Sequence, residues 1–333
     1  MDIGLIGYGG VGKEFIKLLI DKKDFLKAKG IMINVKYLIK SNGGIYKKEG
    51  IDLEEVITLE DDIAKHKDFN KDININTIID NKDIETLVEL TNTDLETGGA
   101  GLNHIILALE NKINVVTGNK GPIVLEYNNL KDIAVKNKVK LLFGCTTGGA
   151  LPTLNAGTYD IAGSEITKIE GILNGTSNYI LTEMYENNDD YEVVLKKAIK
   201  EKIAEANYSY DVEGYDTAAK ILIVANALMN TNLKLEDIKI EGITKLTKEE
   251  ILREKEKGNK PKLIGSIYKE ENKIKAEVKL EFIDKNHNLY SVDGKNKGIT
   301  YYTDTLGNIS VIGGASGTKN AAAAILRDIV NSK

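Results

Sequence analysis

In the first part of the chain, short apolar runs alternate with longer segments whose apolar residues recur at helical spacing. After a first strand at Ile3–Ile6, the apolar runs predict strands at 31–39, 77–79, 87–90, 113–116 and 139–143. The helical spacing predicts helices between the later strands, at 101–111 and 123–137. Alternation of strand and helix indicates an α/β fold with a doubly wound parallel sheet, in which ligands bind beyond the carboxyl ends of the strands.

The second part of the chain has a different pattern. It predicts a strand at 168–173, a helix at 179–185 and strand-like alternation through 260–302, clearest at 273–282. A glycine-rich loop and an apolar helix at 321–330 follow. We therefore expect a second, α+β domain with its own sheet at 139–304. Residues 1–138 and 305–333 should form the other domain, to which the last helix returns.

A glycine motif follows the first strand and reads Gly7-Tyr8-Gly9-Gly10-Val11-Gly12. Between a strand and an amphipathic helix, this spacing is typical of a Rossmann-type dinucleotide site. Gly7 would permit the tight turn, Gly9 would let the backbone approach a pyrophosphate, and Gly12 would let helix and strand pack closely. The anion would lie at the helix N-terminus. A glycine-rich turn without a ligand is the alternative.

The ends of other strands bear on the choice of cofactor. Thr91-Asn92-Thr93 and Thr117–Lys120 fall at carboxyl ends, so they should border the cofactor. NAD specificity usually places an acidic residue after the second strand, where it binds the ribose 2′-hydroxyl. Lys40 and Ser41 stand there instead and suit a 2′-phosphate, so NADP is favoured over NAD. In the other interpretation, Lys40 is a solvated loop lysine.

Composition narrows the class of protein. The 333 residues carry a net charge of −5 with scattered basic residues, which favours neither nucleic acid nor an anionic membrane as a partner. A single cysteine, Cys145, and three histidines argue against a disulfide framework and a Cys/His zinc site. Neither a membrane-length apolar run nor a signal peptide is found, so a cytoplasmic protein is expected.

The segment from Glu205 to Lys220 carries the most specific chemistry. Lys220 is the only charged residue in 217–229, a stretch that predicts a buried helix. A buried ammonium needs a partner, and Asp216, four residues earlier on the same helical face, can supply one. Asp211 and Glu205 could converge on the same place. In the alternative, Asp216 only caps the helix and Lys220 reaches solvent from its first turn.

Through these and further motifs, the chain resembles the homoserine dehydrogenase family over essentially its whole length. The matching segments, in family order, are GYGGVG, TGNKGP (Thr117–Pro122), TTGGALP (Thr146–Pro152), GILNGTSNYI (Gly171–Ile180), EANYSYDVEGYDTAAK and GGASG (Gly313–Gly317). The resemblance implies an oxidoreductase that interconverts L-homoserine and L-aspartate 4-semialdehyde with NADH or NADPH. It also implies that the second domain binds the small-molecule substrate and forms a homodimer.

The resemblance further implies roles for single residues. Lys120 would lie beside the nicotinamide, and Lys120 or Lys220 would give a proton to the developing alkoxide, with Asp216 orienting a lysine. With one lysine in each domain, the site is expected in the cleft between them. The implied substrate-binding residues are Glu205, Asp211, Gly175 and Thr176. The implied cofactor-binding residues, beyond the glycine motif, are Lys40, Ser41, Thr91, Asn92, Thr93, Lys120, Gly314 and Thr318. Backbone carbonyls that would correspond to a monovalent-cation site for Na+ or K+ are those of Gly144, Thr147 and Gly149.

The chain departs from the family pattern in places. Ala206-Asn207-Tyr208 stands where the family usually has Ala-Asp-Pro, which puts the local loop geometry in doubt. Ser177 replaces a commoner threonine. Neither a C-terminal regulatory extension nor a kinase fusion is found, so threonine feedback through such a domain is not expected.

Two other classes of protein fit parts of the sequence. The segment 144–148, Gly-Cys-Thr-Thr-Gly, is similar to the nucleophile segment of phosphorylating aldehyde dehydrogenases, which pair a thiolate with a histidine. No suitably spaced histidine follows Cys145, so this cysteine is expected to be a small buried residue. A nucleotide-sensing regulator without chemistry is the second class, and the intact set of Lys120, Asp216 and Lys220 argues against it.

Overall fold

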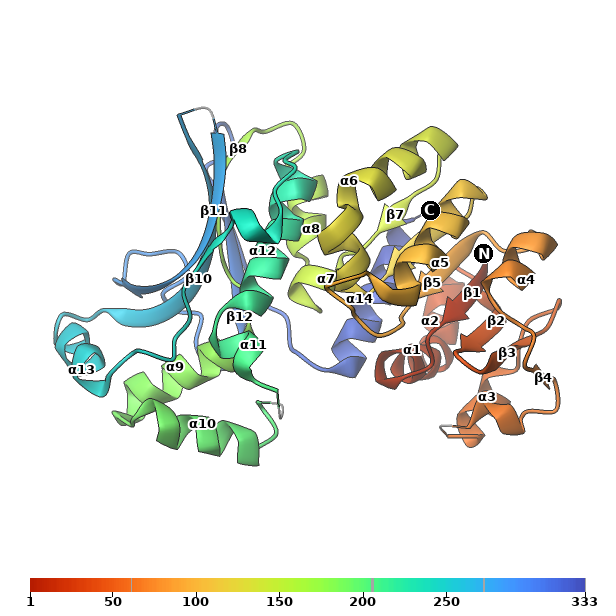
Figure 1. The fold of residues 1–333 in the computed structure, drawn as a ribbon, viewed down its shortest axis with the longest axis horizontal. Helices are drawn as coiled ribbons and strands as arrows, with labels where there is room; N and C mark the ends of the chain where they lie inside the picture. Colours follow the sequence, from red (N-terminus) through yellow and green to blue (C-terminus); the bar gives the residue numbers. More distant parts are fainter. Residues whose placement is uncertain (61, 205–206, 272, 333) are drawn as a thin grey trace. The chain divides into compact units, whose positions relative to one another are not determined.

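The computed structural model describes residues 1–60, 62–204, 207–271 and 273–332, and the chain forms two compact units (Figure 1). Unit 1 comprises Met1–Thr146 and Gly317–Lys333, and unit 2 comprises Thr147–Ser316. The last helix therefore belongs to the same unit as the first strand. The limits expected from the sequence, 138/139 and 304/305, fall earlier in the chain, and as limits of functional domains they stay a prediction.

Unit 1 is built on a seven-stranded sheet with the strand order β4-β3-β2-β1-β5-β6-β7. Strands β2, β1, β5, β6 and β7 run parallel, whereas β3 and β4 pair antiparallel at one edge. The strands are β1 Asp2–Ile6, β2 Asn34–Lys40, β3 Gly43–Tyr46, β4 Phe69–Asn70, β5 Thr86–Glu89, β6 Asn114–Thr117 and β7 Leu141–Leu142. The predicted α/β sheet is thus confirmed.

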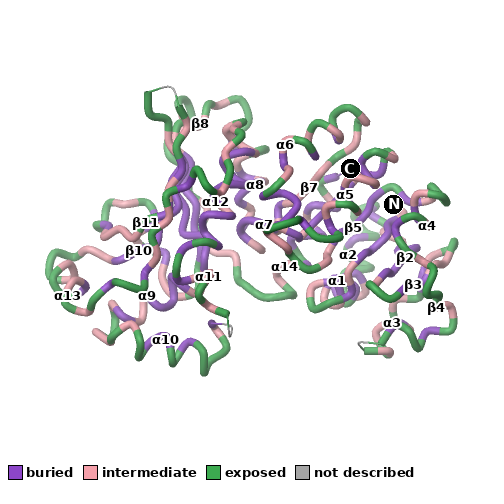
Figure 2. Tube along the Cα trace, viewed as in Figure 1, coloured by how far each residue is buried: buried purple, intermediate pink, exposed green. Residues whose placement is uncertain are grey.

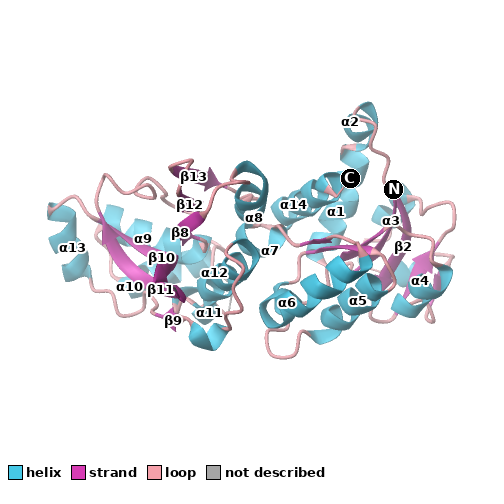
Figure 3. Cartoon of the chain, turned by 90° about the horizontal axis from the view of Figure 1, so that it is seen from above, coloured by secondary structure: helices cyan, strands magenta, loops and turns pink. Residues whose placement is uncertain are grey.

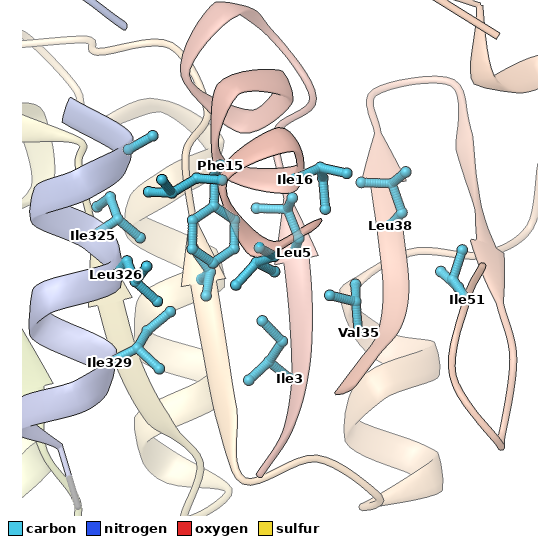
Figure 4. Packing of buried hydrophobic residues seen from close by; sticks show 14 of the residues in the cluster. Ile3, Leu5, Phe15, Ile16, Val35, Leu38, Ile51, Ile325, Leu326 and Ile329 are labelled. Atoms are coloured by element: carbon cyan, nitrogen blue, oxygen red, sulfur yellow. The ribbon is translucent and has the colours of Figure 1, made fainter. Parts of the chain in front are cut away.

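Helices cover both faces of this sheet, with α1 and α14 on one face and α5 and α6 on the other (Figure 3). The helices of unit 1 are α1 Gly10–Asp21, α2 Lys23–Ala28, α3 Leu53–Thr58, α4 Ile75–Asn81, α5 Gly99–Glu110, α6 Lys120–Asn137 and α14 Thr318–Asn331, and α7 Cys145–Gly148 spans the junction with unit 2. In the core, Phe15 of α1 packs with Leu5 of β1 and Ile325 of α14, all three fully buried (Figure 4). Each such side chain contributes roughly 1.5–3 kcal/mol by leaving water.

One predicted strand is wrong. The run 77–79 lies inside α4, because Asn74 caps a helix there. The Asn74 side chain accepts from the Asn76 N–H at 2.9 Å, and the Asn74 N–H donates to Thr77 Oγ1 at 3.2 Å. Three apolar residues cannot distinguish a strand from one helical turn, whereas this capping pattern can.

After β2 the chain does not cross to the other face of the sheet. Ser41 and Asn42 form a tight turn, and Lys40 pairs with Gly43 in an antiparallel hairpin with β3. Gly43 has a φ of +129°, a conformation that favours glycine.

Unit 2 has its own six-stranded sheet, as predicted, with the strand order β13-β12-β8-β10-β11-β9. The strands are β8 Ile166–Ile172, β9 Lys239–Ile240, β10 Lys260–Glu270, β11 Lys273–Ile283, β12 Lys297–Thr303 and β13 Asn308–Gly313. The helices are α8 Thr153–Asn155, α9 Gly175–Asn187, α10 Tyr191–Lys200, α11 Ser209–Val212, α12 Tyr215–Leu228 and α13 Lys248–Glu256.

Helix α12 is buried along almost its whole length, as its apolar sequence predicts (Figure 2). It packs directly on β10, where a Cβ on Gly265 would lie 3.1 Å from Thr217 Cγ2 and 3.3 Å from Ile221 Cγ1. Glycine at this position therefore brings the helix close to the sheet. Within the described ranges, the chain contains no helix both long and apolar enough to cross a membrane.

Candidate active site

The turn between β1 and α1 gives each glycine of the motif a physical role. Gly7 has a φ of +105°, and a Cβ there would lie 2.4 Å from the carbonyl carbon of Leu90. A Cβ on Gly12 would lie 2.2 Å from the Gly7 oxygen, so only glycine lets α1 start this close to the turn. At Gly9, the residue before α1, the space for a Cβ is open. The first turn of α1 contains no acidic residue, so the geometry fits a pyrophosphate.

Another predicted cofactor residue lies beside this motif. Thr318 opens α14, and its Cγ2 would be 3.0 Å from a Cβ on Gly10. Tyr8 is buried, and Val11 is half-buried in the first turn of α1. Gly10 and Thr318, far apart in the sequence, thus meet within unit 1.

Gly314 belongs to unit 2. Its φ is +70°, and a Cβ on it would lie 2.5 Å from the backbone nitrogen of Leu151. Close packing against Leu151 therefore explains this glycine within its own unit.

The predicted residues after β5 and β6 are joined by the side chain of Asn119. Its Nδ2 donates to Thr91 Oγ1 and to the Asn92 carbonyl, each at 3.3 Å. Its Oδ1 accepts from the Gly121 N–H at 3.1 Å and so caps α6, whose first residue is Lys120. Asn92 and Thr93 are exposed. The structure thus links Thr91-Asn92-Thr93 to the start of the helix that carries Lys120.

Lys40 and Ser41 stand at the same edge of the sheet as the glycine turn. Lys40 is the last residue of β2 and is half-buried, while Ser41 is exposed in the hairpin turn. Strand β2 neighbours β1, and the Gly7 N–H donates to the Ile39 carbonyl at 2.9 Å. A 2′-phosphate would be expected at this place in a Rossmann-type site.

In unit 2, Lys220 and Asp216 form a buried ion pair on α12. Lys220 Nζ lies 2.5 Å from Asp216 Oδ2 and donates to the Leu173 carbonyl at 2.8 Å. The side chains are only 15% and 9% exposed. Gly214, in the left-handed conformation, precedes the helix, and Asp216 is its second residue. The alternative of a helix cap and a solvent-reaching lysine is therefore wrong.

Asn174 brings a second carboxylate into this cluster. Its Nδ2 donates to Asp211 Oδ1 at 2.6 Å and to Asp216 Oδ2 at 2.8 Å, and its Oδ1 accepts from the Ser177 N–H at 2.9 Å to cap α9. Burial and the neighbouring Asp216 carboxylate raise the pKa of Asp211, although Asn174 and Lys220 oppose the rise. Two carboxylates and one ammonium therefore share a mostly buried place.

Gly175 and Thr176 open α9 beside this cluster. A Cβ on Gly175 would lie 3.0 Å from the Lys295 carbonyl and 3.5 Å from Ser316 Oγ. Thr176 Oγ1 donates to the Ile203 carbonyl at 3.3 Å. The structure thus brings Asp211, Asp216, Lys220, Gly175 and Thr176 to one corner of unit 2. Glu205, the remaining predicted substrate residue, lies outside the described residues.

The segment predicted to bind a monovalent cation is tied down by side chains. The Gly144 N–H donates to Asp328 Oδ2 at 2.7 Å, and Thr147 Oγ1 bonds with Thr153 Oγ1. Next to Gly149, whose φ is +60°, the Gly148 carbonyl accepts from the buried Lys297 Nζ at 2.7 Å. No cluster of three or more His, Cys, Asp or Glu side chains suited to a metal occurs in the described part of the chain.

Cys145 packs against the core of unit 1. It is half-buried, and its Sγ would lie 3.8 Å from a Cβ on Gly118. Cys145 is therefore less buried than expected and lies beside the core, not within it.

Two residues of these networks were missed in the sequence. Asn174 stands directly before Gly175 and three residues before Ser177, and an asparagine at this spacing is a helix-capping signal. Glu89 lies in the predicted apolar strand 87–90, and it is a fully buried carboxylate at the end of β5. A charged residue inside an apolar run, as Glu89 is, indicates a buried carboxylate that needs hydrogen-bond partners.

Comparisons with known proteins agree with one another. A family model described as homoserine dehydrogenase matches residues 152–330. The homoserine dehydrogenase of Methanocaldococcus jannaschii is 37% identical over 99% of this chain and 98% of its own length. A protein of Pseudomonas canavaninivorans named NAD(+)-dependent homoserine dehydrogenase is 28% identical over 99% of this chain and 95% of its own.

A solved structure shows the same likeness in three dimensions. The crystal structure of a homoserine dehydrogenase from Thiobacillus denitrificans has a TM-score of 0.84 and 26% identity, covering 100% of this chain and 73% of that one. A dinucleotide-type turn in unit 1, a buried lysine–carboxylate cluster in unit 2 and sequence identity along the full length point the same way. The chain therefore belongs to the homoserine dehydrogenase family.

Proposed function

We propose that this protein catalyses the NAD(P)-dependent interconversion of L-homoserine and L-aspartate 4-semialdehyde, in the cytoplasmic biosynthesis of threonine, methionine and isoleucine. The buried cluster of Asn174, Asp211, Asp216 and Lys220 carries the proposal. Burying two carboxylates and an ammonium is costly, so a fold keeps such a cluster where a polar ligand makes use of it.

The cluster suits the amino-acid part of the substrate. It holds one carboxylate more than it holds ammonium groups, so a substrate α-ammonium would balance its charge. Asp211 and Glu205 are our candidates for that contact. Gly175 and Thr176, at the N-terminus of α9, are our candidates for the substrate carboxylate, since a helix N-terminus favours an anion.

Lys220 is suited to proton transfer at the substrate oxygen. The nicotinamide cofactor would supply the hydride chemistry, and the protein supplies orientation and charge. An ammonium has three N–H groups. Among the described residues, two of them bond Asp216 and the Leu173 carbonyl, which leaves the third for a substrate oxygen. Lys120, at the start of α6, is the second candidate for this step.

We favour NADP as the cofactor, held by the glycine motif, by Lys40 and Ser41 at the 2′-phosphate, and by Thr91-Asn92-Thr93 near the nicotinamide. The half-buried Lys40 at the end of β2 and the exposed Ser41 that follows it supply a cation and a hydroxyl instead of a carboxylate, which supports this preference. The name of the Pseudomonas relative gives NAD(+) for that protein. The ratio of kcat/KM for the two cofactors decides between them.

We also propose that the segment 144–149 accepts Na+ or K+ through its backbone carbonyls. The Lys297 ammonium on the Gly148 carbonyl already supplies one positive charge there, so the effect of the ion should be modest. Turnover compared in sodium, potassium and choline buffers of equal ionic strength measures it.

A homodimer is a further part of the proposal. Gly265 faces α12, so the alternating residue Ser266 points to the other face of the unit 2 sheet. A hollow of about 370 Å³ on that side is lined by both signs of charge, including Glu170, Glu277 and Lys279. A surface with mixed charges suits contact with a second copy. Light scattering on purified protein gives the assembly state.

The direct test is the reaction itself. Purified protein is mixed with L-homoserine and NADP, or NAD, and the reduced-nicotinamide absorbance is followed. We expect signal with homoserine and none with serine, which lacks one methylene. Folded protein that gives no signal with either cofactor would overturn the proposed function.

A further inference from the structure

Glu89 is a buried carboxylate for which the reaction gives no direct use. It ends β5 and is 0% exposed. Its Oε1 accepts from the Thr91 N–H at 3.0 Å and from Thr91 Oγ1, and its Oε2 accepts from Thr117 Oγ1 at 3.1 Å. Thr91 follows β5 and Thr117 ends β6, so one carboxylate ties together the ends of two neighbouring strands.

The network continues from these threonines to the start of α6. The Asn119 N–H donates to Thr117 Oγ1 at 3.0 Å, and Asn119 Nδ2 donates to Thr91 Oγ1 at 3.3 Å. Asn119 in turn caps α6 through the Gly121 N–H. Lys120 lies between Asn119 and Gly121 in the sequence, so its backbone is fixed by a network that begins at Glu89.

The packing leaves the carboxylate little freedom. A Cβ on Gly101 of α5 would lie 2.5 Å from Asn119 Nδ2 and 3.1 Å from Glu89 Oε2. His104 Nδ1 of the same helix lies 3.8 Å from Glu89 Oε1 and makes no hydrogen bond to any residue that the structure describes. A buried carboxylate costs several kcal/mol unless its oxygens are bonded. The hydrogen bonds of the Glu89 carboxylate go to Thr117 at the end of β6 and to Thr91 in the segment that follows β5.

We propose that Glu89 is a positioning residue for the nicotinamide half of the cofactor site. It holds Thr91 and Asn119 in fixed places and so presets Asn92, Thr93 and Lys120. The adenosine half, at the glycine motif and Lys40, does not depend on it. This inference rests on the proposed function for the identity of the bound cofactor.

The division between the two halves gives a test that separates positioning from general stability. Glu89→Ala is compared with wild type in calorimetric titrations with NADP and with 2′-phospho-ADP-ribose, which lacks the nicotinamide. We expect NADP to bind about tenfold more weakly, a loss of about 1.4 kcal/mol. The fragment should bind within about twofold of wild type, because it contacts only the adenosine half.

Turnover supplies the second measurement. We expect kcat of Glu89→Ala to fall about 100-fold, as for a displaced proton donor, with the KM for homoserine within about twofold. Glu89→Gln keeps the shape and one acceptor oxygen, so it should recover most of the NADP affinity and of kcat. Thr86→Val is the matched control, because it alters a fully buried residue at the other end of β5.

Two results for Glu89→Ala would contradict the proposed positioning role. Unchanged NADP affinity and kcat in Glu89→Ala would overturn the inference. Equal loss of NADP and fragment binding would overturn it too, since Glu89 would then support unit 1 as a whole. If wild-type protein does not turn over homoserine but binds NADP, the proposed function fails while the binding comparison still tests Glu89.

Discussion

At the scale of single residues, Lys220 shows how burial turns a common side chain into a candidate for catalysis. Its ammonium is held by Asp216 and by the Leu173 carbonyl on a helix that is otherwise apolar. A surface pair at this spacing is worth only about 0.2–0.5 kcal/mol and implies nothing about function. Here Asn174 bonds the same Asp216 carboxylate and adds Asp211, so the pair belongs to a larger site.

The two lysines should matter more than the cysteine. We expect Lys120→Ala and Lys220→Ala each to lower kcat by about 100-fold or more, the range of a lost general acid. Both should still bind the cofactor, as measured by the fluorescence of bound reduced nicotinamide. Cys145→Ser should stay active, because Cys145 packs against the core of unit 1. An inactive Cys145→Ser together with an active Lys220→Ala would reverse the assignment.

The Asp211 carboxylate should lower the stability of the folded protein, although turnover should require it. Its pKa in the folded protein is raised above the usual 3.8, chiefly by burial and then by Asp216. Its ionised form is therefore disfavoured in the fold, and this cost appears as pH rises through 3.8 and up to the raised value. Asp211→Asn removes the charge and keeps an acceptor for Asn174. We expect the thermal midpoint of Asp211→Asn to lie above that of wild type at pH 7.

The same substitution has a pH signature. The gain in midpoint should shrink as pH falls through the raised pKa of Asp211 and should vanish below 3.8, where the wild-type carboxyl is protonated in both states. Asp211→Ala is the matched variant, because it leaves the Asn174 amide without this acceptor and should not stabilise. Turnover should fall in both. A midpoint gain that does not change with pH would contradict the assignment of the raised pKa.

The sequence predicted residues that belong to local motifs and missed those that act across the fold. Asp216 and Lys220 are four residues apart on one helix, so their pairing is visible in the sequence. Asn174 bonds residues 37 and 42 positions away, and only the folded chain brings these partners together. Glu89 likewise bonds a residue far away in the sequence, since Thr117 lies 28 positions later.

At the scale of elements, the turn from β1 into α1 contains one glycine that the fold requires and one that cofactor binding should require. A Cβ on Gly12 would lie 2.2 Å from the Gly7 oxygen, whereas a Cβ on Gly9 would meet open space. Gly12→Ala should therefore lower the thermal midpoint, because the free energy of unfolding should fall by about 1–3 kcal/mol.

Gly9→Ala should melt like wild type but bind NADP about tenfold more weakly, measured by calorimetry. Wild-type affinity in Gly9→Ala would mean that the pyrophosphate does not approach this residue.

Element type was predictable where a pattern was long, and uncertain where it was short. The parallel strands around β1 and the buried helix α12 agree with their patterns. The run 77–79 was too short, and the capping residue Asn74 decided for a helix. The hairpin after β2 depends on the turn at Ser41 and Asn42, for which an alternation of apolar residues gives no signal.

At the scale of the whole molecule, the chain leaves unit 1 at Thr146 and re-enters it at Gly317. Unit 1 is therefore completed by α14, which packs on α1 through Ile325 and Ile329 (Figure 4). The sequence indicated this return from a glycine-rich loop before an apolar helix. It could not fix the limits of the units, because junction loops carry no periodic pattern.

The two units should respond to different ligands. Hydrogen exchange followed by mass spectrometry reports local opening along the whole chain. NADP should slow exchange at 7–13, 91–93 and 118–121, and in unit 2 only at the closing loop that holds Gly314.

L-Homoserine added with NADP should slow exchange further at 174–178 and 209–220, where Asn174, Asp211 and Lys220 are held together. A bound ligand at 100 times its Kd stabilises a unit by about 2.7 kcal/mol, which is enough to be seen at these segments. If NADP alone slowed exchange across 209–220 as much as both ligands do, the assignment of this cluster to the amino-acid substrate would be wrong.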